Sequence, residues 1–433
     1  MSCNNWVSYS LFPPKIVREV PLFNEHCVVN GLVTATQWLE LMSLLNPTQP
    51  RLGSRPEVST RAKLVLFVLG LGLALVGAEI LLRVLWVPVV TVHTETRGDH
   101  PDYGFAPLAG IKGRFARTEY NVEFRHSAQR LRMDRLVVAE REPGVNERYL
   151  FLGDSFTYSI GTEAKDSFSG RLADLWPDVE VINAACTGYG PREELAVLDK
   201  LGGVLKPDVV VISFFWNDVE DALRTEPAYG ENASGKVSRT SPPDETSDPL
   251  RLWPEQPSLP QSKWKTCYVF EFSREMTASL RRKYSGKERP NQINAPEQME
   301  QAWLTFDAQY RLLKLRADEI GARLVVAHIP DYIIINPQSA IASVKPLNFT
   351  TSVRLSEICA KHRIEFHDTT PVFTAAFESR GGVAGAKGHP LFYETDRHLT
   401  VEGNAVMAEF LKSVLERGAR KISKTNLEDG HGR

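Results

Sequence analysis

The sequence predicts an α/β fold with three layers, in which a central, mostly parallel five-stranded sheet lies between helices. Short apolar runs that predict strands are at residues 149–152, 179–182, 208–214, 323–329 and 364–366. Helical patterns lie at residues 163–175, 192–205, 296–320, 351–362 and 401–417. Strands that alternate with helices in this way predict a parallel sheet that is covered on both faces.

An apolar run at residues 64–82, LVLFVLGLGLALVGAEILL, predicts one transmembrane helix. Its only charge is Glu79, and about 20 apolar residues in a helix are needed to span a bilayer. The basic residues before the run outnumber the single acid Glu57, and they are Arg51, Arg55, Arg61 and Lys63. By the positive-inside rule, the N-terminus is cytoplasmic and the rest of the chain is exported. We therefore expect an anchor at residues 61–88.

Two other interpretations of this run stay open. The helix could be buried in a soluble protein, although such helices are rarely so uniformly apolar. It could also belong to a cleaved signal peptide with a site at Val76-Gly77-Ala78, but the preceding segment is long for a leader. Residues 1–60 show no clear core, and we expect a cytoplasmic segment that is disordered.

The remainder of the chain divides into a main domain and its attachments. Residues 89–147 predict a small antiparallel lead-in of strands and turns, and residues 148–420 the α/β domain. Residues 222–294 form an insertion that is too long for a simple crossover. Its first half predicts a mobile surface loop, its second half an amphipathic helix, and the whole could act as a lid. Residues 421–433 predict a polar tail.

Composition narrows the class of protein. The chain has 433 residues, of which 42% are hydrophobic and 24% charged, with a formal net charge of −2. This balance gives no electrostatic reason to expect nucleic-acid binding. Five cysteines are scattered without a CxxC pair, which argues against a zinc site and against a disulfide framework.

Five polar or small residues fall just after predicted strands or before the last helix. Ser155 follows the first strand, Gly188 the second and Asn217 the third, while Asp396 and His398 precede the last helix. Ligands of open parallel sheets bind at the carboxyl ends of the strands. Each residue alone has a structural explanation as a cap, a turn or a surface loop, but the ordered set predicts an active site.

This combination resembles the SGNH/GDSL hydrolase family. Gly153-Asp154-Ser155 matches the first conserved block of the family. Gly188, with Asn183 before it, matches the second block, and Asn217 matches the third. Asp396 and His398 match the last block, although many members have Asp-x-x-His where this chain has Asp-x-His. The shorter spacing also occurs in alginate-acetylation proteins of the same superfamily. The resemblance is closest to bacterial members with a membrane anchor, and it implies a flavodoxin-like SGNH hydrolase fold.

The chemistry of these residue types agrees with that resemblance. Ser155 would be the nucleophile and His398 its general base, while Asp396 would hold the imidazole in the required tautomer. The oxyanion would be bound by the Ser155 and Gly188 amides and by the Asn217 side chain. We expect Asp154, Asp218, His328, His367 and Cys186 to be structural.

The sequence therefore predicts a serine esterase that hydrolyses O-acyl esters, with O-acetyl groups of cell-surface or extracellular carbohydrate as substrates. The enzyme would be a single-pass protein of the bacterial inner membrane with an extracytoplasmic domain and no cofactor or metal. An O-acetyltransferase that uses the same triad stays open, as does a non-catalytic glycan-binding component of an export assembly. The sequence sets neither the acyl group, nor the alcohol, nor the oligomeric state.

Overall fold

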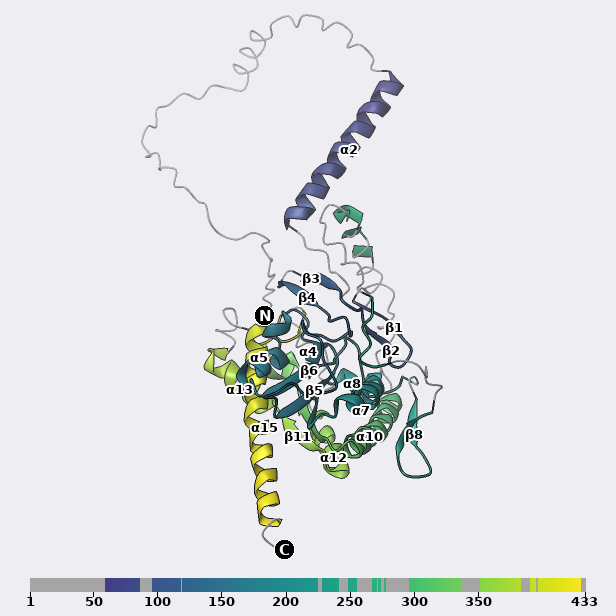
Figure 1. Cartoon of the computed structure of the whole chain (residues 1–433). Coiled ribbons are helices and arrows are strands. Elements are labelled where there is room, and N and C mark those ends of the chain that lie inside the picture. Colours follow the sequence, from purple (N-terminus) through teal and green to yellow (C-terminus); the bar gives the residue numbers. More distant parts are fainter. Residues whose placement is uncertain are drawn as a thin grey trace, which may run out of the picture. The chain divides into compact units, whose positions relative to one another are not determined.

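The structure is a computed structural model of the whole chain (Figure 1). The residues that it describes are 59–85, 96–117, 119–224, 228–240, 248–254, 267–270, 272–273, 276–277, 296–336, 351–382, 390–394 and 396–429. The prediction that residues 1–60 form a disordered cytoplasmic segment concerns residues that, apart from 59 and 60, lie outside these ranges. Contacts divide the chain into two compact units, Met1–Gly70 and Leu71–Arg433.

The apolar run forms one long helix, α2 (Thr60–Leu85). Its stretch from Thr60 to Val84 is long and apolar enough to cross a membrane, and none of its most apolar window is buried. Length and composition support the predicted anchor, while the side of the membrane and the orientation stay predictions.

The main unit is built on a five-stranded sheet in the order β11-β10-β7-β5-β6, in which every pair is parallel. The strands are β5 (Glu147–Gly153), β6 (Val179–Asn183), β7 (Val209–Phe214), β10 (Arg323–His328) and β11 (Glu365–Asp368). Every residue of β6 and β7 is buried. The predicted α/β class and sheet are therefore confirmed.

Alternate side chains of each strand enter two separate cores, one on each face of the sheet. On one face, side chains such as Leu150 and Ile212 pack with α6, α10 and α12. On the other face, side chains such as Phe151 and Val211 pack with α5, α13 and α15. Both faces are covered, which is why the strands read as continuous apolar runs.

The helices of this unit differ in places from the predicted spans. They are α4 (Ser155–Tyr158), α5 (Phe168–Leu175), α6 (Pro191–Val197), α7 (Gly203–Leu205), α8 (Asn217–Asp221), α10 (Pro296–Glu319), α11 (Tyr332–Ile335), α12 (Thr351–His362), α13 (Thr370–Ser379) and α15 (Val401–Asp429). The helix predicted at 163–175 is broken because Ser167 is extended and caps α5 through its hydroxyl. A π turn joins α6 to α7. Helix α15 continues into the predicted tail.

The lead-in consists of two antiparallel hairpins, as predicted. Strand β1 (Arg97–His100) pairs with β2 (Gly104–Pro107), and β3 (Lys112–Ala116) with β4 (Asn121–Arg125). A small core, which includes Phe115, Phe124 and Tyr158, joins the second hairpin to the residues that follow β5.

The first half of the insertion contains structure that the sequence did not predict. Strands β8 (Tyr229–Glu231) and β9 (Val237–Arg239) form a hairpin. The Asn232 side chain accepts the Ser234 and Lys236 amides and so closes the turn. The loop prediction is therefore wrong there. Most of the predicted amphipathic helix lies outside the described residues.

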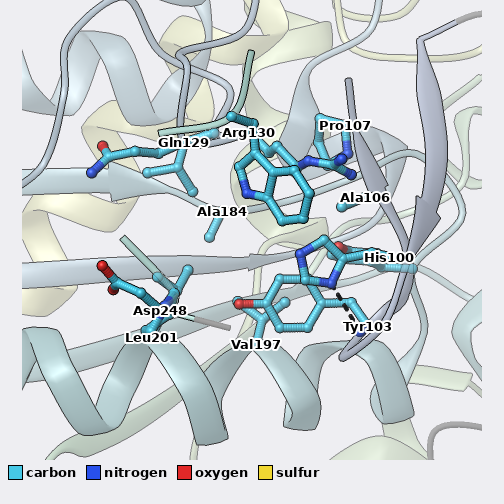
Figure 2. A pocket seen from close by; sticks show the side chains of 14 residues that line it. His100, Tyr103, Ala106, Pro107, Gln129, Arg130, Ala184, Val197, Leu201 and Asp248 are labelled. Atoms are coloured by element: carbon cyan, nitrogen blue, oxygen red, sulfur yellow. Dashed lines mark hydrogen bonds between the residues drawn. The ribbon is translucent and has the colours of Figure 1, made fainter. Parts of the chain in front are cut away.

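A later piece of the insertion, residues 248–254, lies against the lead-in. The Trp253 amide donates to the Ala128 carbonyl at 2.9 Å. Figure 2 shows the cavity beside this contact, where the His100 and Tyr103 rings stack 4.2 Å apart. Its volume is only about 20 Å³, which is room for about one water molecule. Burial, with the charge of Arg130, lowers the pKa of His100 to about 4. We assign this cavity a structural role.

Candidate active site

Ser155 stands at the carboxyl end of β5, where the chain turns sharply into α4. Gly153 adopts a φ of +145°, which favours glycine. Asp154 caps the short helix by accepting the Phe156 amide at 2.8 Å. The connections from β5 and β7 leave in opposite directions in the sheet order, so Ser155 and Asn217 flank the point where parallel sheets bind ligands.

His398 lies against Ser155. Its Nε2 is 2.8 Å from Ser155 Oγ, and its Nδ1 contacts Asp396 Oδ1. With the proton on Nδ1, the imidazole donates to Asp396 and accepts from the Ser155 hydroxyl. The predicted serine, histidine and aspartate therefore form one continuous hydrogen-bonded chain, although 243 positions separate the first two in sequence.

The short Asp-x-His spacing is made possible by the residue in between. Arg397 adopts a φ of +71°, and its guanidinium pairs with both carboxylate oxygens of Asp331. Asp331 also accepts the Trp216 indole N–H at 3.1 Å. Because Trp216 precedes Asn217, one carboxylate links the loop of His398 to the loop of Asn217.

The lead-in holds the other side of Asp396. The Tyr120 hydroxyl donates to Asp396 Oδ2 at 2.9 Å, and Arg117 Nη1 lies 2.6 Å from the same oxygen. Glu119 accepts the Asp396 amide at 2.9 Å. Burial alone would raise the pKa of Asp396, but the contacts with His398, Arg117 and Tyr120 outweigh it and lower the pKa to about 2. Asp396 is therefore anionic at neutral pH.

Asn404 of helix α15 holds the loop of His398 in place. Asn404 is fully buried and donates to the Leu399 and Thr400 carbonyls. Its Oδ1 accepts the Ser159 hydroxyl at 3.0 Å and the Phe168 amide at 2.9 Å. This one side chain thus joins the loop of His398 to the segment that follows Ser155.

The Asn217 side chain is engaged with carboxylates. Its Nδ2 donates to Asp154 Oδ2 and to Asp221 Oδ2, both at 3.2 Å. The sequence predicted an oxyanion donor, and an incoming oxyanion would have to replace one of these acceptors. By contrast, the backbone N–H groups of Ser155 and Gly188 have no acceptor in the described part of the chain.

Hydrogen bonds connect Gly188 to the residues beside Ser155. The Gly188 carbonyl accepts Arg224 Nη2 at 2.7 Å, and Arg224 pairs with Asp221 at 2.9 Å. Asp221 holds Asn217, which holds Asp154 beside Ser155. Gly188 adopts a φ of +82°. The sequence-predicted residues are thus brought into one network.

Three carboxyl groups are buried here, Asp154 within this network and Glu194 and Asp218 close to it. Burial raises the pKa of Asp154, Glu194 and Asp218, and their mutual repulsion raises those of Glu194 and Asp218 further. Both oxygens of Glu194 lack a hydrogen-bond partner among the residues that the structure describes. Among the described residues, no group of three or more histidine, cysteine or carboxylate side chains could hold a metal ion.

The remaining polar candidates have structural surroundings. His328 contacts Asp368 at 3.1 Å and His367 contacts Glu365 at 2.8 Å, both within the sheet edge. Burial raises the pKa of the Cys186 thiol to about 12, so it is an inert side chain. These residues stay outside the Ser155 chain, as predicted.

The sequence analysis missed Arg117, Tyr120, Asp331 and Asn404. Arg117 and Tyr120 precede the α/β domain and meet Asp396 only through the fold. Asp331 follows β10 in the motif HIPD, and Asn404 follows the histidine in HLTVEGN. The position of Asp331 at a strand end was the one local signal.

The fold and site thus define an α/β protein with a serine–histidine–aspartate chain at the carboxyl edge of a parallel sheet. No protein-family profile matches the chain, and no curated protein matches it. The chain is similar to solved structures that include esterases and a lipolytic protein of the G-D-S-L family.

One of these structures is the R55A mutant of Axe2, an acetyl-xylooligosaccharide esterase from Geobacillus stearothermophilus, with 17% identity, 63% of this chain and 95% of that chain covered, and a TM-score of 0.35. A second is esterase EstA from Pseudoalteromonas sp., with 12% identity, 64% and 100% covered, and a TM-score of 0.34. A third is a protein of the G-D-S-L family from Desulfitobacterium hafniense, with 12% identity, 62% and 99% covered, and a TM-score of 0.35. Similarity at this level does not by itself assign an activity or a site.

Proposed function

We propose that the protein is a serine esterase of the SGNH/GDSL family that hydrolyses O-acyl esters through an acyl-enzyme. The observation that carries this proposal is the chain from Ser155 through His398 to Asp396, with a Ser155 Oγ to His398 Nε2 distance of 2.8 Å. A serine hydroxyl needs a base at this distance to become a nucleophile.

The first half of the reaction would form the acyl-enzyme. Ser155 Oγ attacks the ester carbonyl carbon and its proton moves to His398 Nε2. The tetrahedral oxyanion is bound by the Ser155 and Gly188 amides, with Asn217 as a third donor once it releases a carboxylate. Collapse breaks the bond to the alcohol oxygen, which takes the proton from His398.

The second half would release the acid. A water molecule gives its proton to His398 Nε2 and attacks the acyl carbon, and Ser155 leaves with that proton. Asp396 stays ionised throughout and stabilises the imidazolium. Its lowered pKa, about 2, supports this role.

The expected substrates are O-acetyl groups on extracellular or cell-surface carbohydrate. This part of the proposal depends on the predicted export of the domain behind α2, as a single-pass protein of the bacterial inner membrane. The site itself contains nothing that names the acyl group or the alcohol.

A second candidate is an O-acetyltransferase on exported polysaccharide, favoured by the Asp396-x-His398 spacing. The two functions differ in the acceptor of the acyl group, water or a sugar hydroxyl. Hydrolysis of p-nitrophenyl acetate without a sugar supports the esterase. Strong stimulation by a glycan that itself becomes acetylated would instead support the transferase.

Fluorophosphonate labelling of the full chain in detergent tests the proposal directly. We expect labelling of the wild-type protein and none of Ser155→Ala. A matched control is Ser413→Ala, which alters a surface serine of α15. A folded wild-type protein that is not labelled, or a Ser155→Ala protein that is labelled equally, would contradict any serine-enzyme function and favour a binding role.

A further inference from the structure

We propose that Arg97 is a positioning residue for the oxyanion hole, because it holds and polarises the peptide group between Thr187 and Gly188. This inference rests on the proposed function of the same site. Arg97 lies on β1 in the lead-in, outside the α/β domain.

The contact joins the arginine to the one peptide that matters for the oxyanion. Arg97 Nη1 donates to the Thr187 carbonyl, across 90 positions of sequence. That carbonyl and the Gly188 N–H belong to the same planar peptide unit. Fixing the oxygen therefore fixes the direction of the N–H, which has no acceptor among the described residues.

The charge of Arg97 is not neutralised by an acid. Its guanidinium lies over the Phe105 ring, 4.2 Å from the centroid, and it forms no ion pair with a described residue. Phe105 is itself held by Tyr189, whose hydroxyl donates to the Phe105 carbonyl at 3.0 Å. The positively charged guanidinium of Arg97, stacked on the Phe105 ring, therefore faces the peptide unit between Thr187 and Gly188.

Arg224 provides a comparison on the other side of Gly188. It donates to the Gly188 carbonyl at 2.7 Å, but it also pairs with Glu193 at 3.0 Å and with Asp221 at 2.9 Å. Two carboxylates thus offset its charge. Arg224 fixes the backbone, whereas Arg97 adds a net positive field.

The geometry also explains the glycine. A Cβ at position 188 would meet Arg97 Nη1 at an impossibly short distance. The guanidinium fills the space beside the peptide, so a side chain at position 188 would displace it, and the φ of +82° favours glycine as well.

The physical effect is on the transition state. A charged donor on a carbonyl strengthens the hydrogen bond that the N–H of the same peptide can donate. The gain is largest when that N–H meets a full negative charge, which develops only after Ser155 attacks. Loss of Arg97 should accordingly lower kcat more than it alters KM.

Steady-state kinetics on an aryl acetate would measure this difference. We expect Arg97→Gln to lower kcat by about 10- to 100-fold, less than the loss of a direct donor, with KM within about twofold. The rate of fluorophosphonate labelling should fall in parallel, because that reaction also passes through a charged oxygen. The matched control is Arg114→Gln, an exposed arginine of β3 that pairs with Glu123, with unchanged kcat.

The outcomes separate the two proposals. If wild-type protein is neither labelled nor active, the proposed function is wrong. If wild-type protein is labelled and Arg97→Gln keeps its kcat within twofold, or changes only KM, the role of Arg97 is wrong and the esterase stands.

Should Arg97→Gln fail to fold by circular dichroism, Arg97→Lys and Arg97→Met decide. Lysine keeps the charge, although it lacks the planar fork that stacks on Phe105, so it should retain much of the wild-type kcat, whereas uncharged methionine should lower kcat with unchanged KM. Equal kcat values for the two variants would overturn the inference.

Discussion

Arg397 Nη2 contacts both carboxylate oxygens of Asp331, and this ion pair holds the residue between the aspartate and the histidine of the site in a left-handed conformation. Non-glycine residues with positive φ are uncommon and need support from their surroundings. Here the support also reaches Trp216, next to Asn217. The ion pair therefore sets the position of the loop of His398 relative to the loop of Asn217.

Loss of this pair should lower activity through His398. We expect Asp331→Ala and Arg397→Ala each to reduce kcat about tenfold or more, because displacements near 1 Å are costly in active sites. The double variant should lose little beyond either single one, since both remove the same contact. Asp174→Asn, an exposed aspartate of α5, is the control, and fully additive losses would count against the coupling.

Arg117 should stabilise the fold in a pH-dependent way. The pKa of Asp396 is lowered to about 2 from 3.8, so its partners together contribute about 2 kcal/mol at neutral pH, where the unfolded carboxyl is ionised too. That contribution is lost as the pH falls through the folded-state pKa. Arg117→Gln should therefore lower the free energy of unfolding by about 1 kcal/mol at pH 7 and by little near pH 2. Urea unfolding measures this, with exposed Arg125→Gln as the control, and a pH-independent loss would refute the linkage.

Glu194 should affect the pH dependence of stability in the direction opposite to Arg117, because its pKa is raised in the folded state and not lowered. Burial holds its pKa well above the usual value, so the folded state binds a proton that the unfolded state releases, and stability falls as the pH rises above the ordinary carboxyl range. Glu194→Gln removes this cost without changing shape. We expect its Tm to exceed that of the wild type by a margin that widens from pH 4 to pH 8. A constant margin would show that Glu194 does not titrate with folding.

Asn217 should matter more for turnover than for binding. We expect Asn217→Ala to lower kcat by about 100- to 1000-fold, the usual loss of one oxyanion donor. Exposed Asn146→Ala, which loses only a contact with Asp178, should leave kcat unchanged. Because Asn217 is bonded to Asp154 and Asp221, a drop confined to Tm, with normal kcat, would assign it a structural role instead.

The parallel sheet and the hydrogen-bonded chain of Ser155, His398 and Asp396 could be predicted because their signals are local. Strands such as β7 are apolar apart from one serine, Ser213, and Ser155 and Asn217 follow strand ends closely. The partners of Asp396 could not be predicted in the same way. Arg117 and Tyr120 lie in a separate hairpin, and only the folded chain brings their charges and hydroxyls to the carboxylate.

Two local features, at Asn232 and at Ser167, differ from the predicted secondary structure. The residues around Asn232 predict a polar loop, but the Asn232 side chain accepts hydrogen bonds from backbone amides and closes the turn of a hairpin. Ser167 fell inside a helical pattern, yet an N-cap interrupts it. In both cases a short polar side chain bonds to nearby backbone amides, which competes with the pattern of apolar residues.

The contacts of Tyr120 and Arg117 with Asp396 join distant parts of the chain and so form late in folding. Tyr120 and Asp396 are 276 positions apart, and closing such a long stretch of chain is slow compared with forming hairpins and helices. The hairpin of β3 and β4 can form early, but it meets its carboxylate only after Asp396 has been synthesised. In the proposed mechanism, Ser155 therefore acquires its base only after His398 has been synthesised, so shorter nascent chains hold a hydroxyl without that base.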